Sequence, residues 1–453
     1  MAGRQAPERG STTGSRQPHR AGPAWLALAP LLLGPLAGCT GGGAESGAAP
    51  IPARTVDAAT LVHTTAAQDA DPAKPFTVTA EQGDSITEVT LTGADGRVVA
   101  GALDPGGHGW HSTAGLAAAT RYTARITAAD GHGRPGVTTT DFTTRAADRL
   151  LTASLGPDLG RDVYGVGEPL TVQLSEAVTD PAARQAVERG LTVVSTPAVT
   201  GAWHWVDGKN LHFRPRDYWP AGAAVRLTFD TQNRPIDGTL FGGAPATVAF
   251  HTGDRVEAVI DAEAHQLTFK RNGEVVDTIP VTTGKPGFST RNGVKVVLGQ
   301  ERVVQMKSET IGIAQGSSES YDLKVEWATR VTWSGEYVHA APWSVSSQGV
   351  ANVSHGCTGM STDNAKWFYE QTRVGDIVQV VNSKGNDMEP FGNGFGDWNL
   401  GWDEWVKGSA LGKAVSTAAG APGAGGAGSS AAPSAAAAAQ AAGNGAATAH
   451  PRS

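Results

Sequence analysis

The residues in this chain that could do chemistry centre on one cysteine, in the stretch Ser354-His355-Gly356-Cys357. The 453-residue sequence holds only two cysteines, and a lone cysteine is usually an inert, small hydrophobic side chain. Here His355 precedes the cysteine closely and His339 lies further upstream. A cysteine nucleophile needs a base and oxyanion donors, and a glycine permits a sharp turn that exposes the thiol. The stretch therefore predicts a nucleophilic cysteine site.

Two other kinds of cysteine site fit the spacing less well. A metal centre needs three or four ligands, whereas one cysteine and two histidines occur here without an acidic residue at ligand spacing. A papain-like protease has its cysteine before its histidine in the chain, which is the reverse of the order of His339 and Cys357. We therefore expect no metal and no cofactor.

The elements that must position this site form a unit beginning near residue 254. Apolar and polar residues alternate at 256–260 and 266–269, Asn272-Gly273 is typical of a hairpin turn, and further strands are indicated at 294–298, 328–333 and 377–381. One main helix is predicted, with Ser361 as its N-cap and its end before Gly375. We expect a β-rich catalytic domain over residues 254–382.

Two similar β segments precede it, at about 51–145 and 146–253. Short alternating strands separated by Gly/Asp turns are typical of β-sandwiches. Each segment closes on a Phe-x-Thr strand, at Phe142–Thr144 and Phe250–Thr252, and this spacing is close to one immunoglobulin-like domain of ~100 residues. The chain is therefore predicted to be mainly β, with two tandem immunoglobulin-like β-sandwiches lacking a disulfide.

The C-terminal part divides into an aromatic segment and a low-complexity tail. Residues 383–408 contain Trp398, Trp402 and Trp405, which could stack on a glycan, although packing back onto the catalytic domain is the favoured interpretation. Residues 409–453 are rich in alanine and glycine and have too few large apolar side chains to form a core. We expect that tail to be disordered.

The N-terminus has the features of an export signal. Arginines precede an apolar run, and residues 36–39 read Leu-Ala-Gly-Cys, which resembles a bacterial lipobox with Cys39 as the lipidated residue. The alternative is an ordinary secretory signal that happens to contain a cysteine. Residues 1–39 are thus predicted to be a lipoprotein signal peptide and 40–50 a flexible tether. The net charge of -7 argues against a nucleic-acid partner.

Taken together, these segments resemble the L,D-transpeptidase family, which has a YkuD-type catalytic domain. The resemblance rests on residues 354–357 and on His339 within the stretch 337–343, which reads YVHAAPW. The order of lipobox, two immunoglobulin-like domains, catalytic domain and Trp-rich segment is similar to that of the actinobacterial members. One departure is Gly359, since the family signature has an asparagine at that position.

The resemblance implies a role for each matching residue. Cys357 would be the nucleophile, His339 the base, the backbone carbonyl of Ala340 the acceptor that orients this base, and His355 a further catalytic-site residue. The oxyanion would be held by the amides of Gly356 and Cys357 together with Tyr321. Substrate-binding positions would be Met306, Tyr321, Trp343 and Ser354.

The implied reaction is acyl transfer between peptidoglycan stem peptides. A tetrapeptide donor would lose its terminal D-alanine and form a thioester, and a diaminopimelate side-chain amine would accept the acyl group in a 3→3 cross-link. The protein would be an extracytoplasmic lipoprotein on the outer face of the membrane, facing the cell wall, with roles in wall organisation and cell shape. Carbapenems would acylate its cysteine. The alternatives are an L,D-carboxypeptidase or a catalytically lapsed wall-binding lipoprotein.

Overall fold

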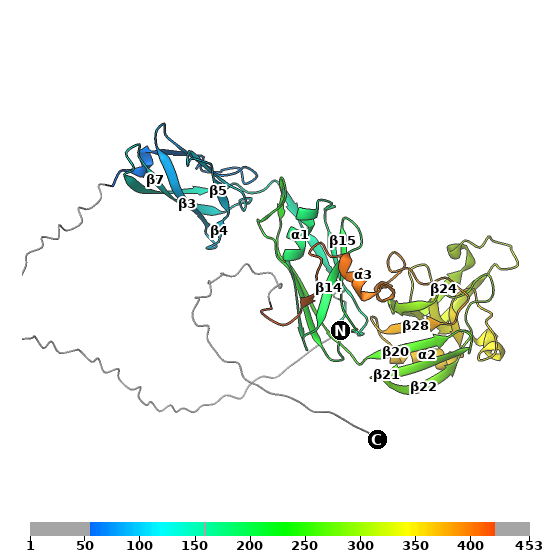
Figure 1. Ribbon diagram of the computed structural model, residues 1–453. Coiled ribbons are helices and arrows are strands. Elements are labelled where there is room, and N and C mark those ends of the chain that lie inside the picture. The colour runs from blue at the N-terminus through cyan, green and yellow to red at the C-terminus, as the bar shows by residue number, and fades with distance from the viewer. Residues whose placement is uncertain (1–54, 158–159, 422–453) are drawn as a thin grey trace, which may run out of the picture. The chain divides into compact units, whose positions relative to one another are not determined.

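Residues 55–157 and 160–421 are described by a computed structural model (Figure 1), in which strands far outnumber helices. The first β-sandwich follows a short 3-10 helix, η1 (Ala58–Thr60). Its sheets share a core in which the Phe76 and Phe142 rings stack at 4.8 Å. One sheet contains β1 (Val62–Thr64), β2 (Thr77–Ala80), β6 (Gly109–Ser112) and β5 (Gly101–Leu103), and the other β4 (Val98–Val99), β3 (Ser85–Gly93), β7 (Arg121–Ala129) and β8 (Pro135–Thr143).

A second sandwich is built on a larger aromatic core that includes Trp203, Phe213 and Trp219. Helix α1 (Pro181–Arg189), capped by Asp180 and missed by the sequence analysis, packs beside it. One sheet contains β10 (Ala153–Gly156), β12 (Leu170–Leu174), β15 (Asn210–Pro215), β14 (Thr200–Trp205) and β29 (Val415–Ser416); the other contains β11 (Val163–Tyr164), β19 (Ala246–Thr252), β16 (Ala224–Phe229) and β13 (Leu191–Thr196). A small sheet joins β17 (Pro235–Asp237), β18 (Leu240–Gly242) and β9 (Arg149–Leu151).

The expectation of disorder from residue 409 onward is wrong for residues 409–421. Strand β29 pairs antiparallel with β14, and Thr417 is fully buried, with its hydroxyl 2.6 Å from that of Ser195. Ser409 donates to the buried carboxylate of Glu188 at 2.8 Å. These residues are held by backbone pairing and buried hydroxyls, which a count of large apolar side chains does not register.

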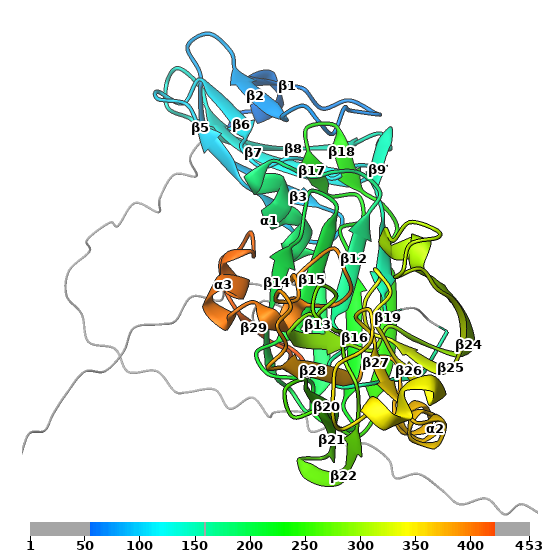
Figure 2. The same ribbon diagram turned by 90° about the vertical axis from the view of Figure 1, so that its right-hand side faces the viewer.

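The catalytic unit has two sheets around one apolar core, with Phe269 and Phe368 in edge-to-face contact. Helix α2 (Thr362–Gln371) begins at the predicted cap Ser361 and packs on β25 and β26, as Figure 2 shows. One sheet is β22 (Glu274–Pro280), β21 (Gln266–Arg271), β20 (Val256–Asp261), β28 (Ile377–Val381) and β23 (Gly293–Val296); the other is β24 (Gly299–Lys307), β25 (Asp322–Arg330), β26 (Tyr337–Ala340) and β27 (Thr358–Met360). The 3-10 helices η2 (Ser308–Ile311) and η3 (Pro342–Ser347) flank this second sheet.

The Trp-rich segment packs more broadly than predicted. Trp405, in α3 (Trp402–Lys407), is fully buried and donates to the carbonyl of Ala202 in the second sandwich at 2.9 Å. The guanidinium carbon of Arg214 lies 4.9 Å from the Trp398 ring and 4.6 Å from that of Trp405. In η4 (Asp397–Asn399), Asn399 bonds Val294 of β23. The segment therefore contacts the catalytic unit, as expected, and also the second sandwich, which the sequence analysis did not foresee.

Candidate active site

Strand pairing brings the two central residues of the site to one place. Strands β26 and β27 run parallel, with His339 opposite Gly359, and Cys357 lies immediately before β27. His339 and Cys357 consequently line the same cavity. The structure thus brings these two predicted site residues together.

Three hydrogen bonds from two side chains hold the turn that presents Cys357. The Ser354 hydroxyl donates to the Cys357 carbonyl at 2.6 Å and accepts the Gly356 amide at 3.1 Å. Thr290 donates its hydroxyl proton to the Gly356 carbonyl at 2.8 Å. Gly356 has φ of +126°, a conformation that side-chain-bearing residues rarely adopt. The sharp turn expected at this glycine is therefore present and is held by hydrogen bonds.

His339 is oriented by its own strand. Its Nδ1 lies 2.8 Å from the backbone carbonyl of Ala340, the partner that the family resemblance implies. Nδ1 can meet a carbonyl only as a donor, so Nε2 is left as the basic nitrogen. Burial lowers the pKa of His339 and outweighs the opposing effect of this carbonyl. The imidazole is therefore a neutral base at neutral pH.

The Cys357 thiol is also neutral in this arrangement. Its Sγ donates to the Gly335 carbonyl at 3.5 Å rather than to His339. Desolvation raises the pKa of the thiol to about 12. The hydrogen bond with the Tyr337 backbone and the positive charge of Lys295 oppose this rise, whereas the negative charge of Glu336 adds to it. Thiol and imidazole thus face the cavity uncharged, and attack on a substrate requires the proton to move from sulfur to the base.

His355 contacts the segment between β24 and β25 (residues 308–321), called the flap below. Its Nε2 lies 2.7 Å from a carboxylate oxygen of Glu319, and Lys285 pairs with the same carboxylate. The His355 ring contacts those of Phe288 and Tyr321, at centroid distances of 4.7 and 5.1 Å. The Glu319 and Tyr321 contacts tie the segment between β24 and β25 to the cysteine loop.

Two hollows meet at Cys357. The first has a volume of about 280 Å³, and all four predicted substrate-binding residues line it together with His339, namely Met306, Tyr321, Trp343 and Ser354. The second, of about 400 Å³, shares Tyr321, His355 and Cys357 with the first and is more polar, with Arg291, Ser334 and Glu336 in its wall. A group bound to the sulfur can therefore be approached from either hollow.

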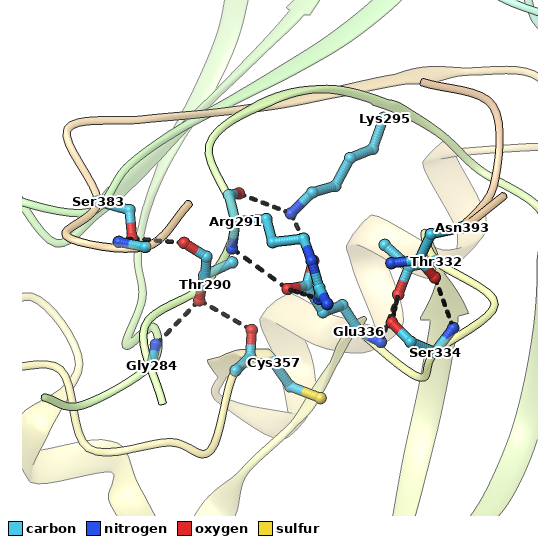
Figure 3. Close-up of polar contacts among 12 residues, drawn as sticks. Gly284, Thr290, Arg291, Lys295, Thr332, Ser334, Glu336, Cys357, Ser383 and Asn393 are labelled. Atoms are coloured by element: carbon cyan, nitrogen blue, oxygen red, sulfur yellow. Dashed lines mark hydrogen bonds and ion pairs between the residues drawn. The ribbon is translucent and has the colours of Figure 1, made fainter. Parts of the chain in front are cut away.

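A charged cluster beside Cys357 was missed by the sequence analysis (Figure 3). Lys295 is fully buried and its Nζ lies 2.6 Å from Glu336 Oε2, while Arg291 reaches Glu336 Oε1 at 3.1 Å. Glu336 directly follows Gly335, the residue that accepts the thiol hydrogen bond. The available signal was a lysine at an inward position of the apolar run 294–297, with a glutamate just before residues 337–343.

Gly359, the departure from the family signature, fits a crowded position. A Cβ atom there would lie 2.9 Å from the Cβ of Ala341 and 3.2 Å from a methyl group of Thr282. The Gly359 amide and carbonyl instead pair with the backbone of Thr282, at 2.8 and 2.9 Å. The turn geometry is thus maintained without an asparagine side chain.

The described residues contain neither a cluster suited to a metal ion nor a membrane-spanning helix, and they do not include the predicted lipidation site. Among residues 55–157 and 160–421, no group of three or more His, Cys, Asp or Glu side chains is suited to a metal ion. The same residues contain no helix long and apolar enough to cross a membrane. The predicted lipidation site, Cys39, and the tether at 40–50 lie outside the described residues.

Comparison with known proteins gives matches across most of the described chain. Residues 67–234 match the model of a bacterial Ig domain and residues 255–380 that of an L,D-transpeptidase catalytic domain. L,D-transpeptidase 2 of Mycobacterium tuberculosis is 38% identical over 336 residues, covering 74% of this chain and 81% of its own. L,D-transpeptidase 1 of the same species is 42% identical over 229 residues, covering 51% and 84%. A solved structure, LD transpeptidase LdtMt1 in complex with imipenem, is 41% identical over 51% of this chain and 99% of its own, with a TM-score of 0.44.

Proposed function

Because this chain belongs to the L,D-transpeptidase family of enzymes acting on peptidoglycan stem peptides, we propose that it forms 3→3 cross-links through a thioester on Cys357. The observation that carries the proposal is the shared cavity of Cys357 and His339, with the imidazole oriented by the Ala340 carbonyl. A lapsed enzyme would not need this arrangement. The predicted roles of the site residues are part of the same proposal.

The first half of the reaction forms the thioester. As Cys357 Sγ attacks the carbonyl between the third and fourth stem residues, His339 Nε2 takes the thiol proton. His339 then returns that proton to the nitrogen of D-alanine as the C–N bond breaks. Oxyanion donors are the Cys357 amide and the Tyr321 hydroxyl, while the Gly356 amide first has to leave its bond with Ser354.

The second half transfers the acyl group to an acceptor. The side-chain amine of diaminopimelate attacks the thioester carbonyl, the C–S bond breaks, and the amine proton returns to sulfur by way of His339. Water attacking the same thioester would give L,D-carboxypeptidase activity instead. The polar second hollow, which Cys357 also lines, is where acceptor and water would compete.

The proposal is tested by incubating the purified protein with a disaccharide tetrapeptide and resolving the products by mass spectrometry. We expect released D-alanine, a 3→3 dimer and an acyl-enzyme mass on the intact protein. Cys357→Ala should abolish all three while leaving the thermal unfolding curve in place. Tripeptide without dimer would indicate a carboxypeptidase, and the absence of any adduct with tetrapeptide or carbapenem would indicate a lapsed enzyme.

We further propose that Cys39 carries a lipid that holds the protein on the outer face of the membrane. The two sandwiches, over 51–145 and 146–253, would then act as a stalk that carries the catalytic domain (254–382) toward the wall. The lipobox residues Leu36 to Cys39 support this proposal. Wild-type protein should partition into the detergent phase of cell extracts and Cys39→Ala into the aqueous phase. Equal partitioning of the two would overturn the anchor.

A further inference from the structure

The polar hollow beside Cys357 is tied to the reacting sulfur by two contacts between neighbouring residues. Thr290, next to Arg291, bonds the carbonyl of Gly356, next to Cys357, at 2.8 Å. On the other side, the thiol donates to Gly335, which directly precedes Glu336. Arg291 and Glu336 therefore line the same hollow as the sulfur, and both are held against the loop that carries it.

The charges around Arg291 are unequally buried. The fully buried Lys295 pairs with one oxygen of Glu336 at 2.6 Å. The other oxygen accepts the backbone amide of Arg291 at 3.2 Å and its guanidinium at 3.1 Å. Two cations thus share one buried carboxylate, and the further carboxylate paired with Arg291, that of Glu389, is exposed.

The exposed partner of Arg291 can be displaced by another anion. The exposed carboxylate of Glu389 lies 3.6 Å from Arg291 Nε, and an exposed pair of this kind is weak and exchangeable. His355, also in the wall, pairs with Glu319. A guanidinium has five donors in a planar fork that matches a carboxylate. Arg291 therefore presents an anion-binding group at the cysteine.

The chemistry of the proposed reaction supplies a matching anion twice. In the first half the nitrogen that leaves belongs to D-alanine, whose α-carbon carries a carboxylate. In the second half the nitrogen that attacks belongs to a diaminopimelate carbon that also carries a carboxyl group. Because the second half is the reverse of the first with a different amine, both nitrogens pass through the same position relative to the acyl carbon.

We propose that Arg291 binds the α-carboxylate of the amino acid whose nitrogen leaves or attacks, with Lys295 neutralising Glu336 so that this charge stays available. This inference rests on the proposed function and adds a selectivity to it. An acceptor with a free carboxylate is preferred over one in which that group is a primary amide. Charge-assisted bonds of this type change affinity by about 10- to 100-fold.

The test compares isotope-labelled D-alanine, whose product differs in mass from the donor tetrapeptide, with D-alaninamide as acceptors for the acyl-enzyme, using full-length protein and kcat/KM from mass spectrometry. In wild type the ratio should favour D-alanine; in Arg291→Met it should fall by about 10- to 100-fold, and in Arg291→Lys by less. Arg302→Met is the matched control. Arg302 also pairs with a glutamate, Glu326, at 3.3 Å, but lines neither hollow, so its ratio should equal that of wild type.

A second readout separates this subsite from catalysis. D-Alanine should slow the alkylation of Cys357 by iodoacetamide in wild type, whereas D-alaninamide should not, and Arg291→Met should lose the protection. Alkylation needs no transpeptidation, so protection without cross-linked product would leave the subsite standing and remove the proposed function. An unchanged acceptor ratio and unchanged protection in a folded Arg291→Met protein would overturn the inference while leaving the proposed function intact.

Discussion

Cys357 should react as a neutral thiol whose proton is removed by His339 during attack. Burial raises the pKa of the thiol to about 12, and burial lowers the pKa of His339. A preformed thiolate–imidazolium pair would require both shifts to have the opposite sign. The two shifts therefore favour removal of the thiol proton during attack over a preformed thiolate.

The expected size of the effect follows from the thiol pKa. With a pKa of about 12, only about one thiol in 30,000 is ionised at pH 7.5, and the thiolate fraction rises about tenfold with each pH unit. Alkylation by iodoacetamide, which reacts with the thiolate, should accordingly rise without a plateau from pH 6 to pH 10. A reference thiol with a pKa of ~8.5 levels off within that range.

The assay follows the intact mass of the protein during alkylation at a series of pH values, with a cysteine-containing peptide as the reference. His339→Ala should slow acylation by tetrapeptide at pH 7.5 by about 10²- to 10⁴-fold, yet leave alkylation at pH 10 within a few-fold of wild type. A wild-type plateau between pH 6 and 8 would refute the reasoning, because it would reveal a stable thiolate. Equal losses in both reactions for His339→Ala would also refute it.

Three further predictions concern charged groups around and away from Cys357. Lys295→Met should lower the free energy of unfolding by up to about 3–5 kcal/mol, because the buried Glu336 then keeps Arg291 as its remaining cation. The double variant with Glu336→Gln should recover most of this loss in urea titrations, and additive losses would show that the pair is not coupled. His355→Ala should slow acylation of Cys357 without abolishing it, since the flap contacts and not the base are lost; complete loss of the carbapenem adduct would contradict this role. Burial raises the pKa of Glu168 to about 8, above that of the unfolded chain, so its contribution to stability is lost as pH rises from about 4.5 to about 8. Glu168→Gln should reduce the pH dependence of the unfolding midpoint in that range, and an unchanged slope would exclude Glu168 as its source.

Features with a local cause could be predicted from the sequence. Ser361 caps α2 with its side chain, Asn272 and Gly273 both have positive φ in the predicted hairpin, and β28 spans the predicted residues 377–381. The cap depends on a side chain that bonds to nearby backbone, and the hairpin depends on the backbone preferences of two residues. The strand depends on an apolar run that packs into a core. The β-sandwich class could be predicted in the same way, from the repeated alternation of apolar and polar residues.

Features that depend on a distant partner could not be predicted in this way. Residues 409–421 lack an apolar pattern, and they are ordered by pairing with β14 and by buried bonds to Glu188 and Ser195. The contact of Trp405 with Ala202 joins residues 203 apart in the chain. Because the C-terminal segment and the second sandwich meet only after folding, the sequence of neither segment indicates that they pair.

The sequence by itself determined which residues could carry the reaction, because Cys357, His339, Gly356 and their neighbours occur in a recognisable order. Only the tertiary structure decided the electrostatic environment of these residues. Glu336 meets Lys295 and Arg291 across 41 and 45 residues, and β pairing places this cluster beside the thiol. Desolvation then sets the protonation of cysteine and histidine, because burial depends on every element packed around them and on no single stretch of sequence.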